Sequence, residues 1–209
     1  VNDKPHIGHA YTTILADVLS RYNRQAGIET FFLTGLDEHG QKVQEAAYKL
    51  GIDPKSHCDK MAPRFTNLWD KLYISNDDFI RTTEERHKKV VKEILKTVMR
   101  NGDIYEAEYE GLYSVSEERF ITEKEADSGA FRDIKTLNEK NYFFKMSKYQ
   151  SKLIKHIKSN SNFIQPSHRK NEILGFLKKP LNDLCISRPK SRLNWGIELP
   201  FDKNYVTYV

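Results

Sequence analysis

The sequence predicts an α/β protein in which helices pack on a parallel sheet. In the first hundred residues, apolar side chains recur every three or four positions in several segments, and short β-rich runs separate those segments. The resulting order of helix, strand, helix, helix, strand and helix is typical of a layered α/β sheet. After Gly102 the sequence changes to short alternating runs rich in tyrosine and phenylalanine, which indicates a small antiparallel β subdomain.

The first predicted helix follows a histidine motif, Pro5-His6-Ile7-Gly8-His9, and ends near Ala26. Its expected apolar face consists of Tyr11, Ile14, Leu15, Val18, Leu19 and Tyr22. The histidines therefore stand at a helix start, where unpaired N–H groups and the helix dipole favour a phosphate. Gly8 lacks a Cβ, which lets a flat ligand approach the backbone closely. A pair of capping or core histidines beside a turn explains the motif equally well.

The first predicted strand, Thr30–Thr34, leads into the turn Gly35-Leu36-Asp37-Glu38-His39-Gly40. Ligands of parallel α/β sheets bind beyond the carboxyl ends of the strands, so the side chains after this strand are candidate site residues. A turn with a solvated acidic cap is the alternative interpretation, and it suits Glu38 better than Asp37.

Three further helices and a second strand complete the α/β part. Helices are predicted at about residues 41–50 and 58–72, with Cys58 and Met61 in the core. A strand follows at Phe79–Thr82, and Thr82 with Glu85 resembles a capping box for the next helix, which ends at Gly102.

The last hundred residues contain two short predicted helices after the β subdomain. They lie at about residues 148–158 and 168–177, and a loop-rich stretch follows them. The lysines between residues 145 and 158 form a charge run, for which a solvated helix face is the default interpretation.

Composition places the chain among ordinary soluble globular proteins. Its 209 residues are 38% hydrophobic and 30% charged, and the net charge of +5 permits contact with a polyanion without showing it. No apolar run reaches the length of a membrane span, and no signal peptide opens the chain. Cys58 and Cys185 form no metal-type pair, so a reduced cytoplasmic protein is expected.

Several stretches resemble the methionyl-tRNA synthetase family, a group of class I aminoacyl-tRNA synthetases, in the right order and over essentially the whole chain. They are Val1–His9, Thr34–Lys42, Phe79–Thr82, Tyr109–Gly111, Tyr142–Phe144, Arg169–Glu172, Ile186–Arg188 and Trp195–Gly196. The histidine motif alone would also suit the isoleucine, leucine, valine or cysteine enzymes, whereas the Asp-Glu-His-Gly turn favours methionine. Leu36 departs from the family's usual threonine.

The resemblance implies a Rossmann-like catalytic domain and an ATP-dependent reaction. Methionine would be activated to methionyl-adenylate and transferred to tRNA(Met), with ATP as a substrate together with Mg²⁺, without zinc and without a membrane. A nucleotide- or tRNA-binding module without catalytic activity is the alternative, and another adenylyl-transferring enzyme is a third possibility.

The resemblance also implies roles for individual residues. His6 and His9 would act on the phosphates, and Asp37 would hold the methionine ammonium group by a charge-assisted hydrogen bond. His39 and Arg188 are weaker candidates on the substrate side, and Arg188 suits a structural ion pair equally well. The residues expected to bind ATP are Asn2, Lys4, His6, Ile7, Gly8 and His9.

The implied domain limits are 1–101 for the first half of the catalytic domain and 102–183 for a connective insertion. Residues 184–209 would return towards a second catalytic half that the sequence does not contain, so an N-terminal fragment is expected. The insertion is expected to be free of zinc, because Ser114 and Glu117 stand where many relatives have a Cys-x-x-Cys pair.

Lys145-Met146-Ser147-Lys148-Tyr149 resembles the family's second signature, Lys-Met-Ser-Lys-Ser. Its fifth residue differs and it precedes the second half of the catalytic fold, so we interpret it as a false match. Ser147 is expected to cap the next helix instead.

Overall fold

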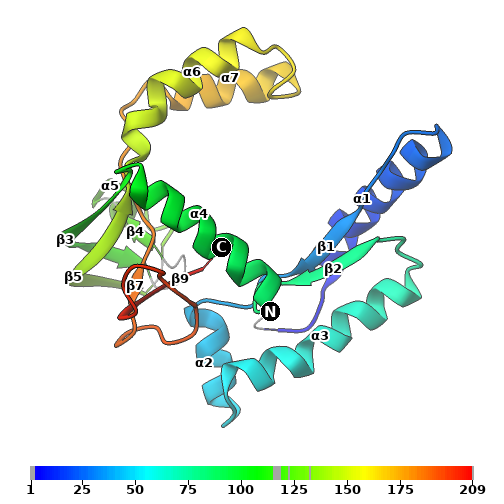
Figure 1. Ribbon diagram of the computed structural model, residues 1–209, viewed down its shortest axis with the longest axis horizontal. Coiled ribbons are helices and arrows are strands. Elements are labelled where there is room, and N and C mark those ends of the chain that lie inside the picture. Colours follow the sequence, from blue (N-terminus) through cyan, green and yellow to red (C-terminus); the bar gives the residue numbers. More distant parts are fainter. Residues whose placement is uncertain (1–2, 115–118, 122, 132, 209) are drawn as a thin grey trace. The chain divides into compact units, whose positions relative to one another are not determined.

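The computed structural model describes residues 3–114, 119–121, 123–131 and 133–208 (Figure 1). The chain forms two compact units, one comprising Val1–Ile94 with Arg188–Val209 and the other Leu95–Ser187. The limits inferred from the resemblance, 1–101, 102–183 and 184–209, stay a prediction about the longer protein.

A two-stranded parallel sheet lies at the centre of the first unit. Strand β1 (Leu33–Leu36) pairs with β2 (Asp78–Arg81), and Leu36 lies opposite Arg81 at the carboxyl ends. The parallel pairing confirms the predicted α/β class. β1 begins three residues later than predicted. Ahead of it, the N–H of Phe32 donates to the side-chain carboxylate of Asp77 at 2.6 Å, and the N–H of Asp77 donates to the carbonyl oxygen of Phe32 at 2.8 Å.

Four helices accompany this sheet: α1 (Ile7–Gln25), α2 (Gln41–Lys49), α3 (Pro54–Lys71) and α4 (Glu85–Arg100). α3 supplies most of the core, because Ala62, Phe65 and Trp69 pack with Leu36 of β1. Cys58 and Met61 are buried as predicted. The predicted spacing of apolar residues along α3 thus marks the face that packs on the end of β1.

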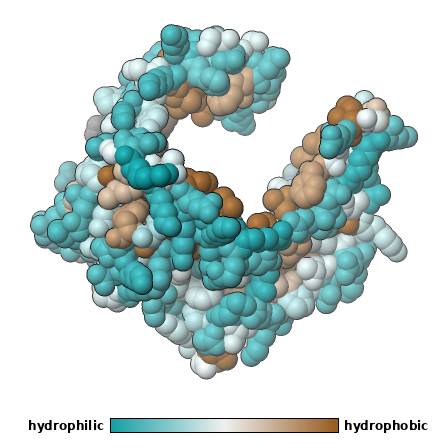
Figure 2. Space-filling view, viewed as in Figure 1, coloured by the Kyte–Doolittle hydropathy of each residue, from teal (hydrophilic) through white to brown (hydrophobic). Residues whose placement is uncertain are grey.

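The apolar face predicted for α1 is exposed within the described chain. Its residues range from 40% exposure at Ile14 to 69% at Tyr11, and they form an apolar band along α1 (Figure 2). The buried residues of the helix are Asp17 and Ser20. Asp17 accepts hydrogen bonds of 2.6 Å from both the backbone N–H and the hydroxyl of Ser75, so α1 is fastened through its polar side.

The final segment adds a small antiparallel sheet to the first unit. Its strands are β7 (Arg188–Pro189), β8 (Ile197–Glu198) and β9 (Tyr205–Thr207), in the order β7-β9-β8. Four nearly inaccessible apolar residues form its interior: Leu193, Ile197, Leu199 and Val206.

The second unit is built on the antiparallel sheet that the sequence predicts. Its order is β4-β3-β5-β6. The elements are β3 (Ile104–Ser114), β4 (Arg119–Ile121), α5 (Glu123–Asp127), β5 (Ile134–Phe144) and β6 (Leu184–Cys185). β3 and β5 pair along their whole length, from Ile104 opposite Phe144 to Ser114 opposite Ile134.

Between β5 and β6 the chain forms a 3₁₀ turn, η1 (Met146–Tyr149), and two helices, α6 (Gln150–Ser159) and α7 (Ser167–Phe176). We call residues 150–179 the helical arm. The Gln150 amide closes its base, since Nε2 donates to the carbonyl oxygens of Leu177 and Lys179, each at 2.8 Å. No helix in the described ranges is long and apolar enough to cross a membrane.

Candidate active site

The histidine motif forms the N-terminus of α1. His6 is the N-cap residue, and its Nδ1 accepts a hydrogen bond from the backbone N–H of Gly8 at 3.1 Å. His9 reciprocates, because its Nδ1 accepts from the backbone N–H of His6 at 3.2 Å. The two imidazole rings lie 3.9 Å apart between centroids. Both interpretations of the motif therefore meet in one place, since the histidines are caps at a helix start.

The reciprocal caps have a consequence for proton placement. An imidazole that accepts through Nδ1 carries its proton on Nε2 when it is neutral. Partial burial and the neighbouring His6 lower the pKa of His9, which favours that neutral form near pH 7. Both rings are exposed, so each can present an Nε2–H donor to a ligand.

Gly8 accommodates the first imidazole. A Cβ at this position would lie 2.9 Å from Cε1 of His6, closer than carbon atoms pack without a shift. The absence of a side chain here thus makes room for the capping ring, in addition to the close ligand approach that the sequence suggests.

His9 connects the helix start to the end of β1. Its ring packs edge-on against Phe65 at 5.3 Å between centroids. Phe65 belongs to the core cluster that contains Leu36, the residue immediately before Asp37. The histidine motif at the start of α1 and the turn after β1 therefore contact the same group of core side chains.

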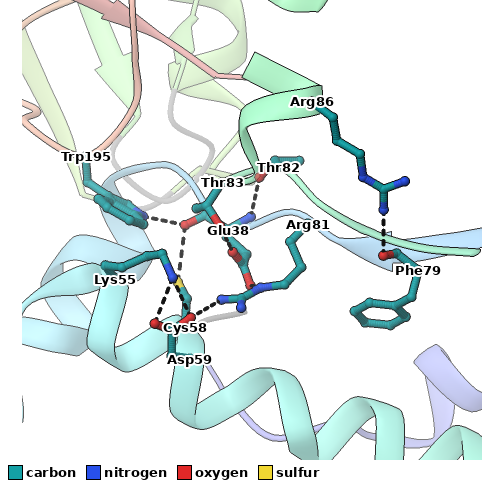
Figure 3. Close-up of polar contacts among 10 residues, drawn as sticks. All are labelled: Glu38, Lys55, Cys58, Asp59, Phe79, Arg81, Thr82, Thr83, Arg86 and Trp195. Atoms are coloured by element: carbon teal, nitrogen blue, oxygen red, sulfur yellow. Dashed lines mark hydrogen bonds and ion pairs between the residues drawn. The ribbon is translucent and has the colours of Figure 1, made fainter. Parts of the chain in front are cut away.

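In the turn after β1, two adjacent carboxylates have opposite environments. Asp37 is exposed, whereas Glu38 is fully buried. The alternative interpretation of Glu38 as a solvated acidic cap is therefore wrong. Its Oε1 pairs with Nε of Arg81 at 2.7 Å, and its Oε2 accepts a short hydrogen bond from the hydroxyl of Thr83 (Figure 3).

The backbone of Glu38 is held as firmly as its side chain. Its N–H donates to Oγ1 of Thr82 at 2.9 Å, and the indole Nε1 of Trp195 donates to its carbonyl oxygen. The sequence predicted Thr82 as a helix cap, but its hydroxyl binds the backbone of Glu38 instead, and α4 begins only at Glu85. The Cys58 thiol also donates to that carbonyl at 3.6 Å. Burial, and secondarily the charge of Glu38, raise the pKa of Cys58 to about 12, so this thiol stays protonated.

His39 lies on the inner side of the same turn. It is 6% exposed, and its ring stands 5.3 Å from that of Trp195. Burial, with a smaller contribution from the positive charge of Lys88 and from His87, lowers the pKa of His39 to about 4. Its Nδ1 is buried and has no hydrogen-bond partner among the described residues. His39 is thus a neutral imidazole behind the turn.

The returning segment closes over the start of α2. Oε1 of Gln44 accepts the backbone N–H groups of Asn194 and Trp195 at 3.0 and 3.1 Å. The N–H of Gly40 donates to the carbonyl oxygen of Trp195 at 3.3 Å. Residues 150 positions apart in the chain thus fix the turn that carries Asp37 and His39.

The remaining predicted site residues have simpler surroundings. Lys4 and Ile7 are exposed beside the helix start, and Asn2 lies outside the described residues. Arg188 is 7% exposed in β7, where it pairs in register with Val206. A guanidinium so deeply buried needs a partner, which keeps the structural interpretation of Arg188 open beside the substrate role.

The sequence did not predict that Arg81, Thr82, Thr83 and Trp195 support the turn, and the role that it suggested for Thr82 was that of a helix cap. One signal was available, because β2 runs parallel to β1 and so places Thr82 and Thr83 beside Asp37 and Glu38 at the same edge. No local signal predicted this role for Trp195, because its hydrogen bond to the carbonyl oxygen of Glu38 joins residues 157 positions apart in the chain.

The stretch Lys145–Tyr149 is committed to contacts within its own unit. Lys148 and the Tyr149 hydroxyl both bind Asp103, and their hydrogen bonds lower the pKa of that carboxyl. Ser147 donates its hydroxyl to Asp183 at 2.6 Å and caps no helix, contrary to expectation. These contacts fasten the base of the helical arm.

The positions at which many relatives have a Cys-x-x-Cys pair lie at and just after the end of β3. Ser114 is buried opposite Ile134, whereas Glu117 lies outside the described residues. Within the described part of the chain, no group of three or more His, Cys, Asp or Glu side chains is placed to hold a metal ion. The absence of zinc stays a prediction.

Comparison with known proteins gives a consistent assignment. The model of the family described as "tRNA synthetases class I (M)" matches residues 1–130 and 130–209. Methionine–tRNA ligase of Fusobacterium nucleatum is 51% identical over 214 residues, which cover 100% of this chain and 33% of the relative. The ligase of Deinococcus radiodurans is 50% identical and is covered to 32%.

Solved structures agree with the sequence relatives. Mycobacterium tuberculosis methionyl-tRNA synthetase bound by methionyl-adenylate superimposes with a TM-score of 0.92 at 37% identity, over 99% of this chain and 42% of that one. The free form of that enzyme gives a TM-score of 0.79. The chain spans about a third of the length of the first two ligases. With its Rossmann-like α/β unit and a family match along its full length, the chain belongs to the methionyl-tRNA synthetase family of class I tRNA synthetases.

Proposed function

We propose that this chain is the N-terminal part of an enzyme that activates methionine with ATP and transfers it to tRNA(Met). The observation that carries the proposal is the pair of imidazoles that cap the start of α1. Their Nδ1 atoms are engaged by the backbone, which leaves two Nε2–H donors at a helix N-terminus. Such donors suit the phosphate of a nucleotide, and the helix dipole adds to the attraction.

In the first step, a carboxylate oxygen of methionine bonds to the α-phosphorus of ATP. The bond from that phosphorus to the bridging oxygen breaks, and pyrophosphate leaves with the electron pair. His6 and His9 would donate to phosphate oxygens as negative charge shifts between them. Lys4 and Asn2 would contact the nucleotide, and Ile7 and Gly8 would form the surface beneath it.

Asp37 would hold the methionine ammonium group. It is exposed at the carboxyl end of β1, where α/β sheets bind their ligands, and the next residue, Glu38, is anchored by its ion pair with Arg81. His39 would support the same side as a neutral imidazole, and Arg188 would approach from β7. Alignment of the two substrates contributes to the rate because it converts a bimolecular reaction into a unimolecular one.

ATP would bring Mg²⁺ with it, and that ion supplies charge neutralisation on the phosphates. We further propose a cytoplasmic location and an insertion without zinc. The acyl group would then pass from the adenylate to the terminal ribose of the tRNA, with release of AMP.

Methionine-dependent pyrophosphate exchange by the full-length protein tests the proposal. We expect His6→Ala and His9→Ala each to slow exchange by about 10²–10³-fold, the usual cost of one lost transition-state donor. Asp37→Ala should weaken methionine binding more than ATP binding. Lys148→Ala is the matched control, because Lys148 pairs with Asp103 within the second unit and should leave exchange nearly unchanged.

The variants also separate the alternatives. Exchange within a few-fold of wild type for both histidine variants would contradict their assignment. Binding of ATP or tRNA without any exchange in the wild-type protein would favour the non-catalytic module. A hundredfold loss in Lys148→Ala, with the fold intact, would show that Lys145–Tyr149 is the catalytic loop.

A further inference from the structure

The turn that carries Asp37 belongs neither to the strand before it nor to the helix after it. Its residues, 37–40, follow the end of β1 at Leu36 and precede the start of α2 at Gln41. The turn ends at Gly40, whose φ of 106° is a conformation that residues with a side chain rarely adopt. The conformation of such a segment depends on hydrogen bonds from other parts of the chain.

Two residues hold the three peptide groups that follow Asp37. The N–H of Glu38, in the first of these groups, donates to Oγ1 of Thr82 at 2.9 Å. The carbonyl oxygen of Glu38, in the second group, accepts the indole N–H of Trp195 (Figure 3). The N–H of Gly40, in the third group, donates to the carbonyl oxygen of Trp195 at 3.3 Å. Trp195 therefore fixes two of the three peptide groups through which the turn leaves Asp37.

Gln44, in the first turn of α2, holds Trp195 in its turn. Oε1 of Gln44 accepts the backbone N–H groups of Asn194 and Trp195 at 3.0 and 3.1 Å. An amide oxygen has two lone pairs, so this one atom satisfies both donors. Because α2 begins directly after the turn, these bonds tie the returning segment to the element that follows Asp37.

The loop that carries Trp195 is itself firmly supported. Leu193 before it and Ile197 after it are 2% and 1% exposed. A Cβ on Gly196 would lie 2.9 Å from the side chain of Val206 in β9, so the loop packs directly on that strand. Trp195 therefore presents its donor and its acceptor from a fixed position, as a residue that orients another must do.

We propose that Trp195 and Gln44 are positioning residues for methionine, which act through the turn on the carboxylate of Asp37. The inference rests on the proposed function, because it takes Asp37 as the group that holds the methionine ammonium. That ammonium keeps its charge while the methionine carboxylate attacks phosphorus, so its contact with Asp37 is equally strong before and during the reaction. Loss of the positioning contacts should therefore raise the Michaelis constant for methionine and leave kcat nearly unchanged.

Pyrophosphate exchange and equilibrium dialysis with methionine, both on the full-length protein, test the proposal. Gln44→Leu leaves two backbone N–H groups without their acceptor, so it should raise the Michaelis constant and the Kd for methionine roughly fivefold or more. Trp195→Phe keeps an aromatic ring but loses the indole donor, and should raise both constants roughly threefold or more. Gln44→Glu retains an acceptor oxygen and should keep both constants within about twofold of wild type. The Michaelis constant for ATP should change less than about twofold in all three variants.

Two controls remove the same kinds of side chain elsewhere in the chain. Gln150→Leu also removes an amide that binds distant backbone, at Leu177 and Lys179, and should leave the methionine constants unchanged. Trp69→Phe removes an indole N–H that is buried without a hydrogen-bond partner among the described residues, and should likewise change neither constant. A rise in either control equal to that in Gln44→Leu would attribute the effect to a general loss of stability and overturn the inference.

A double-mutant cycle with Asp37→Ala shows whether the effect passes through that carboxylate. If it does, adding Gln44→Leu to Asp37→Ala should raise the Kd for methionine no further. Additive effects, or unchanged methionine constants in both Gln44→Leu and Trp195→Phe, would overturn the inference. A wild-type protein that binds methionine without exchange would overturn the proposed function alone, since dialysis would still decide on Gln44 and Trp195. A wild-type protein that binds no methionine would overturn both.

Discussion

Glu38 is the residue on which the turn between β1 and α2 depends. A buried carboxylate is costly unless it is paired and hydrogen-bonded, and Glu38 achieves both through Arg81 and Thr83. Its backbone is fixed at the same time by Thr82 and Trp195. The side chain of the adjacent Asp37 therefore stays exposed to solvent while Glu38 anchors the turn.

We expect Glu38→Gln to lower the free energy of unfolding by about 2–4 kcal/mol, since it leaves Arg81 with a weakened partner in a buried site. The Michaelis constant for methionine should rise more than that for ATP, because Asp37 loses its support. Asp59→Asn is the control. Asp59 pairs with the same Arg81 but is 46% exposed, so its loss should cost only about 0–1 kcal/mol. Equal effects in urea unfolding would contradict this ranking.

His39 gives the molecule a predicted dependence on pH. Its pKa of about 4 lies below the ordinary 6.5, because burial and nearby Lys88 and His87 disfavour the charged form. As pH falls, the unfolded chain takes up the proton first, so stability should fall between pH 6.5 and 4 by about 3 kcal/mol and stay level above 6.5. Urea unfolding of wild type and His39→Asn would measure it. Parallel pH profiles would rule His39 out as the cause.

The sequence reveals residue types and spacing but not which of two adjacent acids points inward. The histidine motif was recognisable because a helix follows it directly. Glu38 was not, because its burial depends on Arg81 and Thr83, more than forty positions away. Local patterns therefore identified the residues that we propose to face a ligand, whereas long-range pairs determine which residues support them.

At the scale of elements, periodicity predicted the helices and strand pairing decided the rest. α2, α3, α6 and α7 lie close to their predicted positions, because their apolar spacing is unambiguous. β1 was displaced, since the apolar run Phe31–Leu33 extends before the ladder, and Phe31 is 71% exposed. On α4, the apolar side chains of Val90 and Ile94 are likewise 54% and 57% exposed. Amphipathic pattern indicates that a face can be buried, and the neighbouring elements determine whether it is.

Gly35 shows how closely the two parallel strands approach. A Cβ at this position would lie 2.0 Å from the carbonyl oxygen of Ile80, which is backbone and cannot yield cheaply. We expect Gly35→Ala to lower the free energy of unfolding by about 3 kcal/mol or more. Gly175→Ala is the control, because nothing surrounds that position in α7 and alanine favours helix there by about 0.5–1 kcal/mol. A Gly35→Ala protein as stable as wild type by chemical denaturation would refute the close approach.

For the whole molecule, the exposed face of α1 is the feature that matters most. Leu15, Val18 and Leu19 are each at least half exposed, and they lie on the helix whose start carries His6 and His9. Apolar bands of this kind usually mark surfaces that another part of a protein covers. The relatives are about three times as long as this chain, so they hold enough further sequence to supply that cover.

The same double substitution should therefore have opposite effects in two contexts. In the 209-residue chain alone, Leu15→Lys/Leu19→Lys should leave the helix content unchanged and reduce binding of a hydrophobic dye, because both side chains already face solvent. In the full-length protein it should lower the free energy of unfolding by about 3 kcal/mol or more, since two charges would be forced into an apolar contact. We expect the short chain to show no methionine-dependent exchange, because nothing holds α1 and its imidazoles from the apolar side. Small effects in both proteins, or exchange by the short chain, would mean that this face of α1 stays open to water in the working enzyme.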